Sequence, residues 1–422
     1  MSRLFPTPPL RSLAWAVAAM TVAAACSDKP ANINTVDAGP LVADSAGLRI
    51  VSDTAPAWGT AQLWTVGNEP TLDLGEPEQP FVGVAPVVRL SDGRIAVVDG
   101  SQQNIRYFDA TGKLLMTVGG RGPEPGQFHA LGWIGRGKAD TLVAYDFVAR
   151  RLTIFDGKGN FVRVAPLLPA DPEALAEPLA TFTDGSVLFR LTTSLNPFPG
   201  KVGQVVRDSA NYLRFGLDGL PSASLGLYPQ SEAFGVQVRA DGPPSPFPLP
   251  FGLVTAAALR ADTMLIGTGT SFEVASVGPD GAAVGLLRAP VERERVTPEV
   301  AKAFTAAAIA RLKAGAQTLN APLPNSLIEA LEKAPFPAMK PAFGRMLVDE
   351  TGALWLSAPL APPAAATSWT VFAPDGTWLG TVTTPEGFRI DVIGVDHLLG
   401  MYRQAHGQER VRSYPLTRGT AN

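Results

Sequence analysis

A small group of polar side chains near the ends of predicted strands could bind a ligand. Asp99 and Asp146 occupy matching positions in two similar segments, and most of the others stand near the corresponding place in later segments. The candidate ligand-binding residues are Asp99, Asp146, Arg190, Tyr402, Arg403 and His129. Carboxylates and arginines that converge beside a water-filled channel could hold a polar ligand or a divalent cation. The alternative is a structural role, because an aspartate at a strand end commonly accepts hydrogen bonds from loop amides.

No familiar catalytic motif occurs in the sequence. Its three histidines, His129, His397 and His406, lack the spacing of a zinc site, and there is no G-x-S-x-G or Walker lysine motif. Any catalytic residues therefore stay unknown and no metal ligands are predicted, and the cofactor stays open, with a divalent cation as one option. A metal-dependent hydrolase or lyase in a central channel is an alternative, because such a site draws one residue from each repeat and leaves no linear motif.

Residues 1–25 have the pattern of an export signal. Arg3 and Arg11 give a positive start, and residues 12–25 form an apolar run that is too short to span a bilayer as a helix. The single cysteine, Cys26, follows three alanines and resembles the lipid-modified cysteine of a bacterial lipobox. We expect Cys26 to become the lipidated N-terminus. An ordinary export signal with an incidental cysteine is the alternative.

Residues 26–48 are polar and rich in alanine and proline, a composition typical of a flexible tether. A lipid anchor would hold the globular part, residues 49–418, at a bacterial membrane. We therefore expect a protein of the cell envelope whose membrane attachment depends on Cys26. The net charge is −3 and no basic stripe is present, which argues against a nucleic-acid partner.

Two segments of the chain repeat one pattern. Residues 92–116 and 140–163 both run from a turn through an apolar strand, an aspartate and a polar loop to Phe-Asp-x-x-Gly and another strand. The glycines of the two copies, Gly112 and Gly159, are about 47 residues apart. A period of this length with several short strands in each unit is typical of β-propeller blades.

Turn and strand signals predict an all-β, six-bladed propeller. The units begin near Val84, Leu131, Ala180, Leu253, Phe343 and Phe388. The last unit has only three strands, and residues 49–75 carry strand-like runs that could supply an outer strand from the N-terminus. Such a strand would close the ring and cover open sheet edges. Five or seven blades remain open because the third and fourth units diverge, and an irregular β-sandwich is a further alternative.

The best repeat resembles a known propeller family. The run GGRGPEPGQF (119–128), followed by strands and by Phe-Asp with a later glycine, is similar to the NHL-type six-bladed repeat over residues 83–165. His129 stands where that family usually has proline. The C-terminal segment is similar to that of bacterial lipoproteins known only as six-bladed propellers. The resemblance implies a fold and a compartment, but no single activity, because NHL-type proteins bind proteins or nucleic acids or hold metal-dependent active sites.

The long insertions of the sequence all fall in one class of connection. In a four-stranded blade, the loop between the second and third strands and the crossing to the next blade share one face of the ring. The long segments of this kind are 191–210, 228–251, 290–342 and 357–368. Length variation on one face of a rigid ring indicates a binding surface. Tolerated surface decoration is the alternative.

The insertion 290–342 has a helical pattern that is unlike the rest of the chain. Thr297 can cap a helix that has Pro298 at its first position, and a second short helix is expected from Asn325 or Ser326. We interpret the pair as a lid over the channel mouth, with a partner-docking arm as the competing interpretation. Taken together, the sequence predicts an exported, lipid-anchored propeller that binds a small-molecule ligand or a protein partner on its long-loop face. A purely structural envelope component is a further alternative.

Overall fold

The computed structural model describes residues 39–59, 63–75, 80–193, 198–238, 242–318, 323–359, 366–404 and 407–419. The chain divides into two units, residues 1–38 and residues 39–422, and all described residues belong to the second. The predicted export signal, Cys26 and the N-terminal part of the predicted tether therefore lie outside the described residues, as does His406. None of the described helices is both long and apolar enough to cross a membrane.

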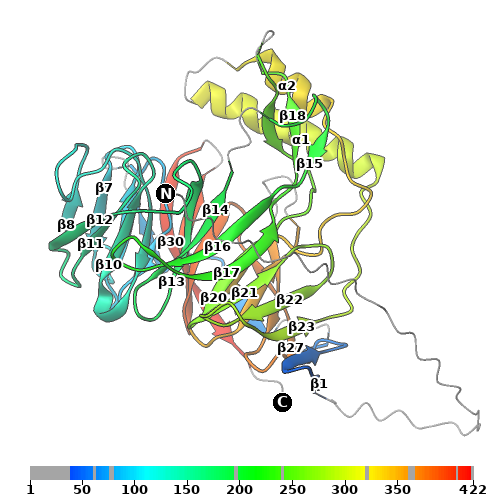
Figure 1. Cartoon of the computed structure of the whole chain (residues 1–422), viewed down its shortest axis with the longest axis horizontal. Helices are drawn as coiled ribbons and strands as arrows, with labels where there is room; N and C mark the ends of the chain where they lie inside the picture. The colour runs from blue at the N-terminus through cyan, green and yellow to red at the C-terminus, as the bar shows by residue number, and fades with distance from the viewer. Residues whose placement is uncertain are drawn as a thin grey trace, which may run out of the picture. The chain divides into compact units, whose positions relative to one another are not determined.

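The described part of the chain is an all-β structure in which six large sheets follow one another in sequence (Figure 1). The first three sheets contain β5 (Val88–Arg89), β6 (Ile95–Asp99), β7 (Asn104–Phe108) and β8 (Leu114–Gly119); β9 (Leu131–Arg136), β10 (Leu142–Asp146), β11 (Arg151–Phe155) and β12 (Phe161–Pro166); and β13 (Leu175–Thr181), β14 (Val187–Thr192), β16 (Ser209–Phe215) and β17 (Pro221–Pro229). A short 3-10 helix, η1 (Lys138–Asp140), connects β9 and β10.

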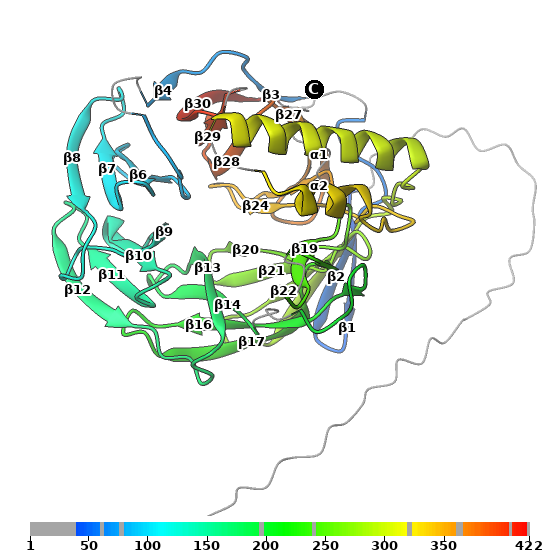
Figure 2. The same cartoon turned by 90° about the horizontal axis from the view of Figure 1, so that it is seen from above.

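The other three sheets repeat the same up-and-down course. They contain β20 (Ala256–Arg260), β21 (Thr263–Gly267), β22 (Glu273–Val277) and β23 (Ala283–Arg288); β24 (Met346–Val348), β25 (Leu354–Ser357), β26 (Thr367–Phe372) and β27 (Trp378–Thr384); and β28 (Phe388–Ile393), β29 (His397–Arg403) and β30 (Glu409–Arg418). Seen from above, the sheets surround a common centre, with β9, β13, β20, β24 and β28 nearest to it (Figure 2). Contacts of β5 with β28 and β9, and of β13 with β9 and β20, join neighbouring sheets at this centre. The arrangement is that of a β-propeller.

Apolar side chains fill the space between each sheet and the next. One cluster joins Ile105 of the first sheet to Ile134 of the second, and the following clusters continue in the same way around the structure. A further cluster joins Val97 of the first sheet to Leu399 and Val411 of the sixth. Burial of apolar surface, at about 25 cal/mol for each Å², therefore stabilises every contact between consecutive sheets, including the contact of the last with the first.

The repeated Phe-Asp-x-x-Gly pattern forms the turn between the last two strands of a sheet. Asp109 Oδ1 accepts hydrogen bonds from the N–H groups of Thr111 (2.9 Å) and Lys113 (3.0 Å). Gly112 has a φ of +93°, and Gly159 in the second copy has a φ of +86°. A residue with a Cβ rarely adopts this backbone conformation, which explains why glycine ends both turns.

The N-terminal segment runs along the outer edges of three sheets. The hairpin of β1 (Leu41–Ser45) and β2 (Leu48–Ser52) extends the fourth sheet, with β2 parallel to β23. The N–H of Trp58 then bonds to Leu379 O (2.9 Å) beside β27. Finally, β3 (Trp64–Val66) and β4 (Leu72–Leu74) pair with β30 of the sixth sheet. Residues 41–45, which we assigned to a tether from their polarity, are instead the edge strand β1, because they pair with β2 in full register.

Three insertions meet in a second, smaller assembly that we name the cap. It consists of a sheet of β15 (Val205–Val206), β18 (Ala233–Val236) and β19 (Ser245–Pro248), and of α1 (Pro298–Thr318) and α2 (Asn325–Glu332). Phe234 and Val236 of β18 pack with Ala330 of α2. Figure 1 shows these elements together at one end of the strands, away from β1.

A short stalk connects the helices of the cap to the propeller. The N–H of Val296 bonds to Ala338 O (3.0 Å), and the N–H of Lys340 bonds to Glu294 O (2.8 Å). Arg293 Nε donates to Lys340 O (2.7 Å), so this side chain links the two backbone segments of the stalk. Seen from above, α1 passes over the region of β27 and β29 and does not cross β9 or β13 (Figure 2).

Candidate functional site

Asp146 is held by backbone amides at the end of β10. Its carboxylate is fully buried and accepts four N–H groups, from His129 (2.7 Å), Ala130 (3.1 Å), Val148 (3.0 Å) and Ala149 (2.9 Å). Burial alone would raise the pKa of Asp146, but these four hydrogen bonds outweigh it and hold the pKa below its usual value. The carboxylate therefore fixes the loops on both sides of the strand.

Asp99 has a similar place in the first sheet. It is also fully buried, and its Oδ1 accepts the N–H groups of Ser101 (3.1 Å) and Gln102 (3.2 Å). Its Oδ2 forms an ion pair with Arg106 of β7. Because neither Asp99 nor Asp146 is exposed, neither carboxylate reaches a ligand in this conformation. Both aspartates instead fit the structural role, in which a carboxylate at a strand end accepts hydrogen bonds from loop amides.

The structure separates the other predicted residues of the first three sheets. His129 is exposed, and its backbone N–H bonds to Asp146. Arg190 on β14 pairs with Glu177 of the adjacent β13. Burial opposes the charge of Arg190, but Glu177 and Tyr212 favour it, so that the pKa is raised. These contacts lie within single sheets or their loops and form no shared cluster.

Tyr402 and Arg403, at the end of β29, lie beside charged side chains of β30. The guanidinium of Arg412 lies 3.7 Å from the centre of the Tyr402 ring, so Tyr402 takes part in a cation–π contact. Arg403 forms an ion pair with Glu409 Oε1 (2.6 Å), and about 43% of the Arg403 side chain is exposed. Arg403 therefore has a charged group that a ligand could approach.

A chain of polar contacts leads from Arg403 to the inner strand of the sixth sheet. The second oxygen of Glu409 accepts the N–H of Val84 (2.8 Å), and Arg389 donates to Val84 O (3.2 Å). Arg389 also forms a two-pronged ion pair with Asp391, with both distances at 3.0 Å. Such paired bonds hold a guanidinium in a fixed orientation.

Two further arginines face this chain from other elements. Arg345, just before β24, donates to Ile390 O (2.8 Å). Burial lowers the pKa of Arg345; Asp391 opposes that effect and Arg389 adds to it. Burial also lowers the pKa of Arg311 on α1, and the positive charge of Arg403 lowers it further. Arginine stays protonated at physiological pH despite such shifts. Arg311 and Arg345 are therefore positively charged groups in surroundings that disfavour the charge.

We name this group the arginine cluster. It consists of Arg311, Arg345, Arg389, Arg403, Asp391 and Glu409. Four guanidinium groups and two carboxylates give it a formal excess of two positive charges. Its members come from the fifth sheet, the sixth sheet and the cap, at the ends of β28 and β29 nearest to α1. Because arginine matches carboxylate and phosphate oxygens in geometry as well as charge, the arrangement can bind an anion.

Sequence reasoning found only Arg403 of this cluster. Arg345 and Arg389 lie at matching places near the starts of β24 and β28, whereas Arg311 lies in an insertion that has no counterpart in the other repeats. A search for arginines at the starts of inner strands would have singled out Arg345 and Arg389, which immediately precede or begin β24 and β28.

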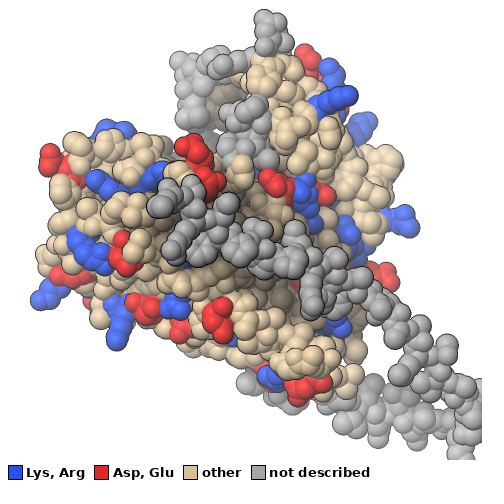
Figure 3. Space-filling model, viewed as in Figure 1, with Lys and Arg blue, Asp and Glu red and all other residues tan. Residues whose placement is uncertain are grey.

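No group of three or more His, Cys, Asp or Glu side chains placed to hold a metal ion occurs among the described residues. Charges of both signs are interspersed among the described residues on the side of the molecule shown in Figure 3.

Comparisons with known proteins find distant structural likenesses. No protein family matches the sequence, and no curated protein is similar to it. An exported protein from Bacteroides fragilis has 11% identity, covers 88% of this chain and 100% of its own, and gives a TM-score of 0.47. A member of the DUF4221 family from Bacteroides vulgatus has 9% identity, with 84% and 99% covered and a TM-score of 0.49. Virginiamycin B lyase from Staphylococcus aureus has 11% identity, with 84% and 99% covered and a TM-score of 0.40.

Proposed function

We propose that this protein is an exported, lipid-anchored, six-bladed β-propeller that binds a small anionic ligand at the arginine cluster, on the face that carries the cap. The six sheets with apolar contacts between each pair of neighbours support the blade count. The pairing of β3 and β4 with β30 supports closure by an N-terminal outer strand. The Gly-Gln-Phe connection supports an NHL-type repeat.

The arginine cluster is the observation that carries the binding function. Arg311, on α1, has no described hydrogen bond or ion pair, and yet it lies close enough to Arg403 for the two charges to oppose each other. An anion between these groups would remove this repulsion. A carboxylate or a phosphate is the ligand class that fits.

The surface of the cap helices favours a small ligand over a docked protein. A protein-docking arm would need an exposed apolar patch. Among the described residues of 290–342, none of the large apolar side chains is exposed; Phe304, for example, packs against Phe251 and Phe336. The helices therefore use their apolar side chains for packing within the cap, and α1 contributes Arg311 at its border with the ring.

Binding of simple anions to arginine variants tests the proposal. Calorimetric titration of the purified protein with citrate and with inorganic phosphate, at constant ionic strength, should show binding that glycerol does not reproduce. We expect Arg311→Gln and Arg403→Gln each to weaken anion binding at least about tenfold, because each removes a charge-assisted contact. Arg94→Gln is the matched control, since Arg94 pairs with Asp92 (2.7 Å) in a short turn at the other end of the strands.

Two results would contradict the proposal. Anion binding that is unchanged in both cluster variants would remove the cluster from the function, and an equal loss in the Arg94 variant would indicate a nonspecific charge effect.

Elemental analysis before and after treatment with a chelator tests the alternative of a metal-dependent hydrolase or lyase. A stoichiometric Ca, Mg or Zn whose removal lowers the melting temperature would favour that alternative.

A further inference from the structure

A pocket of about 230 Å³ opens between the fourth and fifth sheets. Its lining includes Arg260 and Thr263, at the turn between β20 and β21, and residues 374–376, at the turn between β26 and β27. These short turns are at the opposite end of the strands from the arginine cluster. The pocket is therefore separate from the site of the proposed function.

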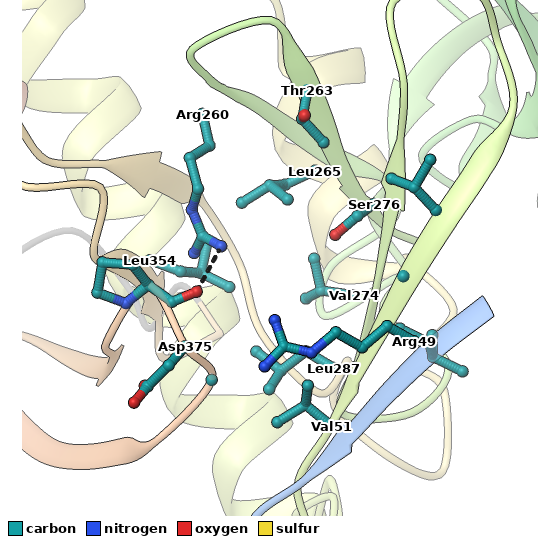
Figure 4. Close-up of a pocket in the computed structure, with 15 residues that line it drawn as sticks. Arg49, Val51, Arg260, Thr263, Leu265, Val274, Ser276, Leu287, Leu354 and Asp375 are labelled. Carbon is teal, nitrogen blue, oxygen red and sulfur yellow. Dashed lines mark hydrogen bonds between the residues drawn. The ribbon is translucent and has the colours of Figure 1, made fainter. Parts of the chain in front are cut away.

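Two guanidinium groups from different elements face this pocket (Figure 4). Arg260 ends β20 and donates one hydrogen bond to Pro374 O (3.3 Å), whereas Arg49 extends from β2 on the other side. Among the described residues, neither arginine has a carboxylate within salt-bridge distance. Asp375 also lines the pocket, but its Oδ1 accepts the N–H of Thr377 (2.9 Å), and Figure 4 shows its carboxylate turned away from Arg49. The polar groups of the pocket therefore include two guanidinium groups that form no ion pair among the described residues, although the charge of Asp349 favours that of Arg260.

The remaining walls are largely apolar. The aliphatic side chains that line the pocket are Val51, Leu265, Val274, Val284, Leu286, Leu287 and Leu354. Thr263 and Ser276 add two hydroxyl groups. A pocket with apolar walls and a few convergent polar groups is the usual form of a small-molecule site. The two guanidinium groups, one from each side of the pocket, favour a ligand with an anionic group.

The volume limits the size of the ligand. An apolar cavity of about 150 Å³ is large enough for benzene, which has six non-hydrogen atoms. In proportion, this pocket of about 230 Å³ would hold about nine non-hydrogen atoms. We propose that it binds a small organic carboxylate with a compact apolar body. The carboxylate lies between Arg49 and Arg260, and the apolar body packs against Leu265, Val274 and Leu354.

The N-terminal hairpin completes this site. β2 contributes Arg49 and Val51, and it pairs in parallel with β23, where Arg49 lies opposite Gly285. One of the two arginines and part of the apolar wall are therefore present only while β2 is docked on the fourth sheet. Bound carboxylate stabilises this docked arrangement, because a ligand that binds one conformation shifts the population towards it.

Titration of the full-length protein with benzoate, which has a carboxylate on a compact ring, tests the assignment. Benzyl alcohol removes the charge and acetate removes the apolar body, so each should bind at least about tenfold more weakly than benzoate. Arg260→Gln should weaken benzoate binding at least about tenfold. Arg136→Gln is the matched control, because Arg136 ends the inner strand β9 as Arg260 ends β20, and it donates to Arg89 O (3.0 Å).

A second variant fills the pocket and leaves both arginines in place. A Cβ at Gly285 would lie 3.4 Å from Arg49 O and 3.5 Å from the Ser276 side chain, which are ordinary contact distances. Gly285→Val should therefore fold, as valine is well suited to a strand, and should reduce benzoate binding at least about tenfold. Melting temperatures of both variants confirm that they are folded at the temperature of the titration.

Several outcomes would overturn the assignment. Acetate that binds as tightly as benzoate would refute the need for an apolar body, and benzyl alcohol that does so would refute the need for a carboxylate. Benzoate binding that survives both Arg260→Gln and Gly285→Val would place it elsewhere. Arg311→Gln separates the two sites: it should weaken citrate binding but leave the benzoate binding that depends on Arg260 unchanged, so failure of the anion site under the cap and failure of this pocket are distinguishable.

Discussion

The hydrogen bonds of Asp146 predict a large loss of stability when the carboxylate is replaced by an amide. Asp146→Asn keeps the shape of the side chain but leaves only one acceptor oxygen. In the protein, Oδ1 accepts the N–H groups of Ala130, Val148 and Ala149, and Oδ2 accepts that of His129. If the amide oxygen takes the place of Oδ1, the new NH₂ group faces the N–H of His129, and two donors oppose each other.

The expected cost follows from these four bonds. A hydrogen bond to a charged group contributes about 1.5–3 kcal/mol, against about 0.5–1.5 kcal/mol for a neutral one, and a buried donor without a partner costs about 1–3 kcal/mol. The loss is reduced because the variant no longer has to bury a charge. We therefore expect Asp146→Asn to lower the free energy of unfolding by about 3 kcal/mol at pH 7.

Urea unfolding at several pH values provides the assay. The pKa of Asp146 is lowered in the folded protein, so its contribution is fully present above the unfolded-state pKa, which is about 3.9, and is lost as pH falls through the folded value. Asparagine does not titrate. The difference in unfolding free energy between the native protein and the variant should therefore be constant from pH 8 to about pH 5 and should narrow below about pH 4.

A matched variant separates burial from charge. Asp109 also accepts backbone N–H groups in a turn, but it is only partly buried, so Asp109→Asn should have a smaller effect than Asp146→Asn. The reasoning is wrong if Asp146→Asn leaves stability unchanged. It is also wrong if the difference between the native protein and the variant does not depend on pH, because the carboxylate charge would then contribute nothing.

Three further predictions concern the N-terminal segment, the cap and the anchor. Trp58→Ala should lower the free energy of unfolding by about 3–5 kcal/mol in urea titrations, since Trp58 is 9% exposed and its ring lies 5.2 Å from that of Trp64; Trp58→Phe should cost less. Arg293→Ala should speed hydrogen exchange in 298–318 without changing the melting of the propeller, because Arg293 ties the stalk; unchanged exchange would refute this role. Cys26→Ser should move the protein from the membrane fraction to the soluble fraction, and a protein that stays with the membrane would refute lipid anchoring.

The features that could be predicted from the sequence are those fixed by neighbouring residues. Asp109 and Gly112 lie within one turn, and their side-chain and backbone requirements appear directly in the repeated pattern. The start of α1 at Pro298 has the same local origin, because proline is suited to the first turn of a helix and no distant contact is needed to place it.

The features that could not be predicted depend on partners far away in the sequence. β1 has no buried residue, so it lacks the apolar alternation that marks a strand, and it exists because β2 pairs with it and with β23. The three-stranded sheet of the cap could not be predicted for the same reason. Val205 pairs with Phe234 across a long stretch of chain, and neither β15 nor β18 shows where its partner will be.

The contrast between the aspartates and the arginines has a general physical cause. A residue that recurs at one place in successive repeats, as Asp99 and Asp146 do, meets a need that every sheet shares, and here that need is to hold the loop amides at a strand end. A ligand needs different groups from several directions, so a binding site draws on positions where the repeats differ. Arg311 is such a position, since it lies in an insertion. In a repeat protein of this kind, the strongest sequence signal therefore identifies the fold, and the departures from it are where binding should be sought.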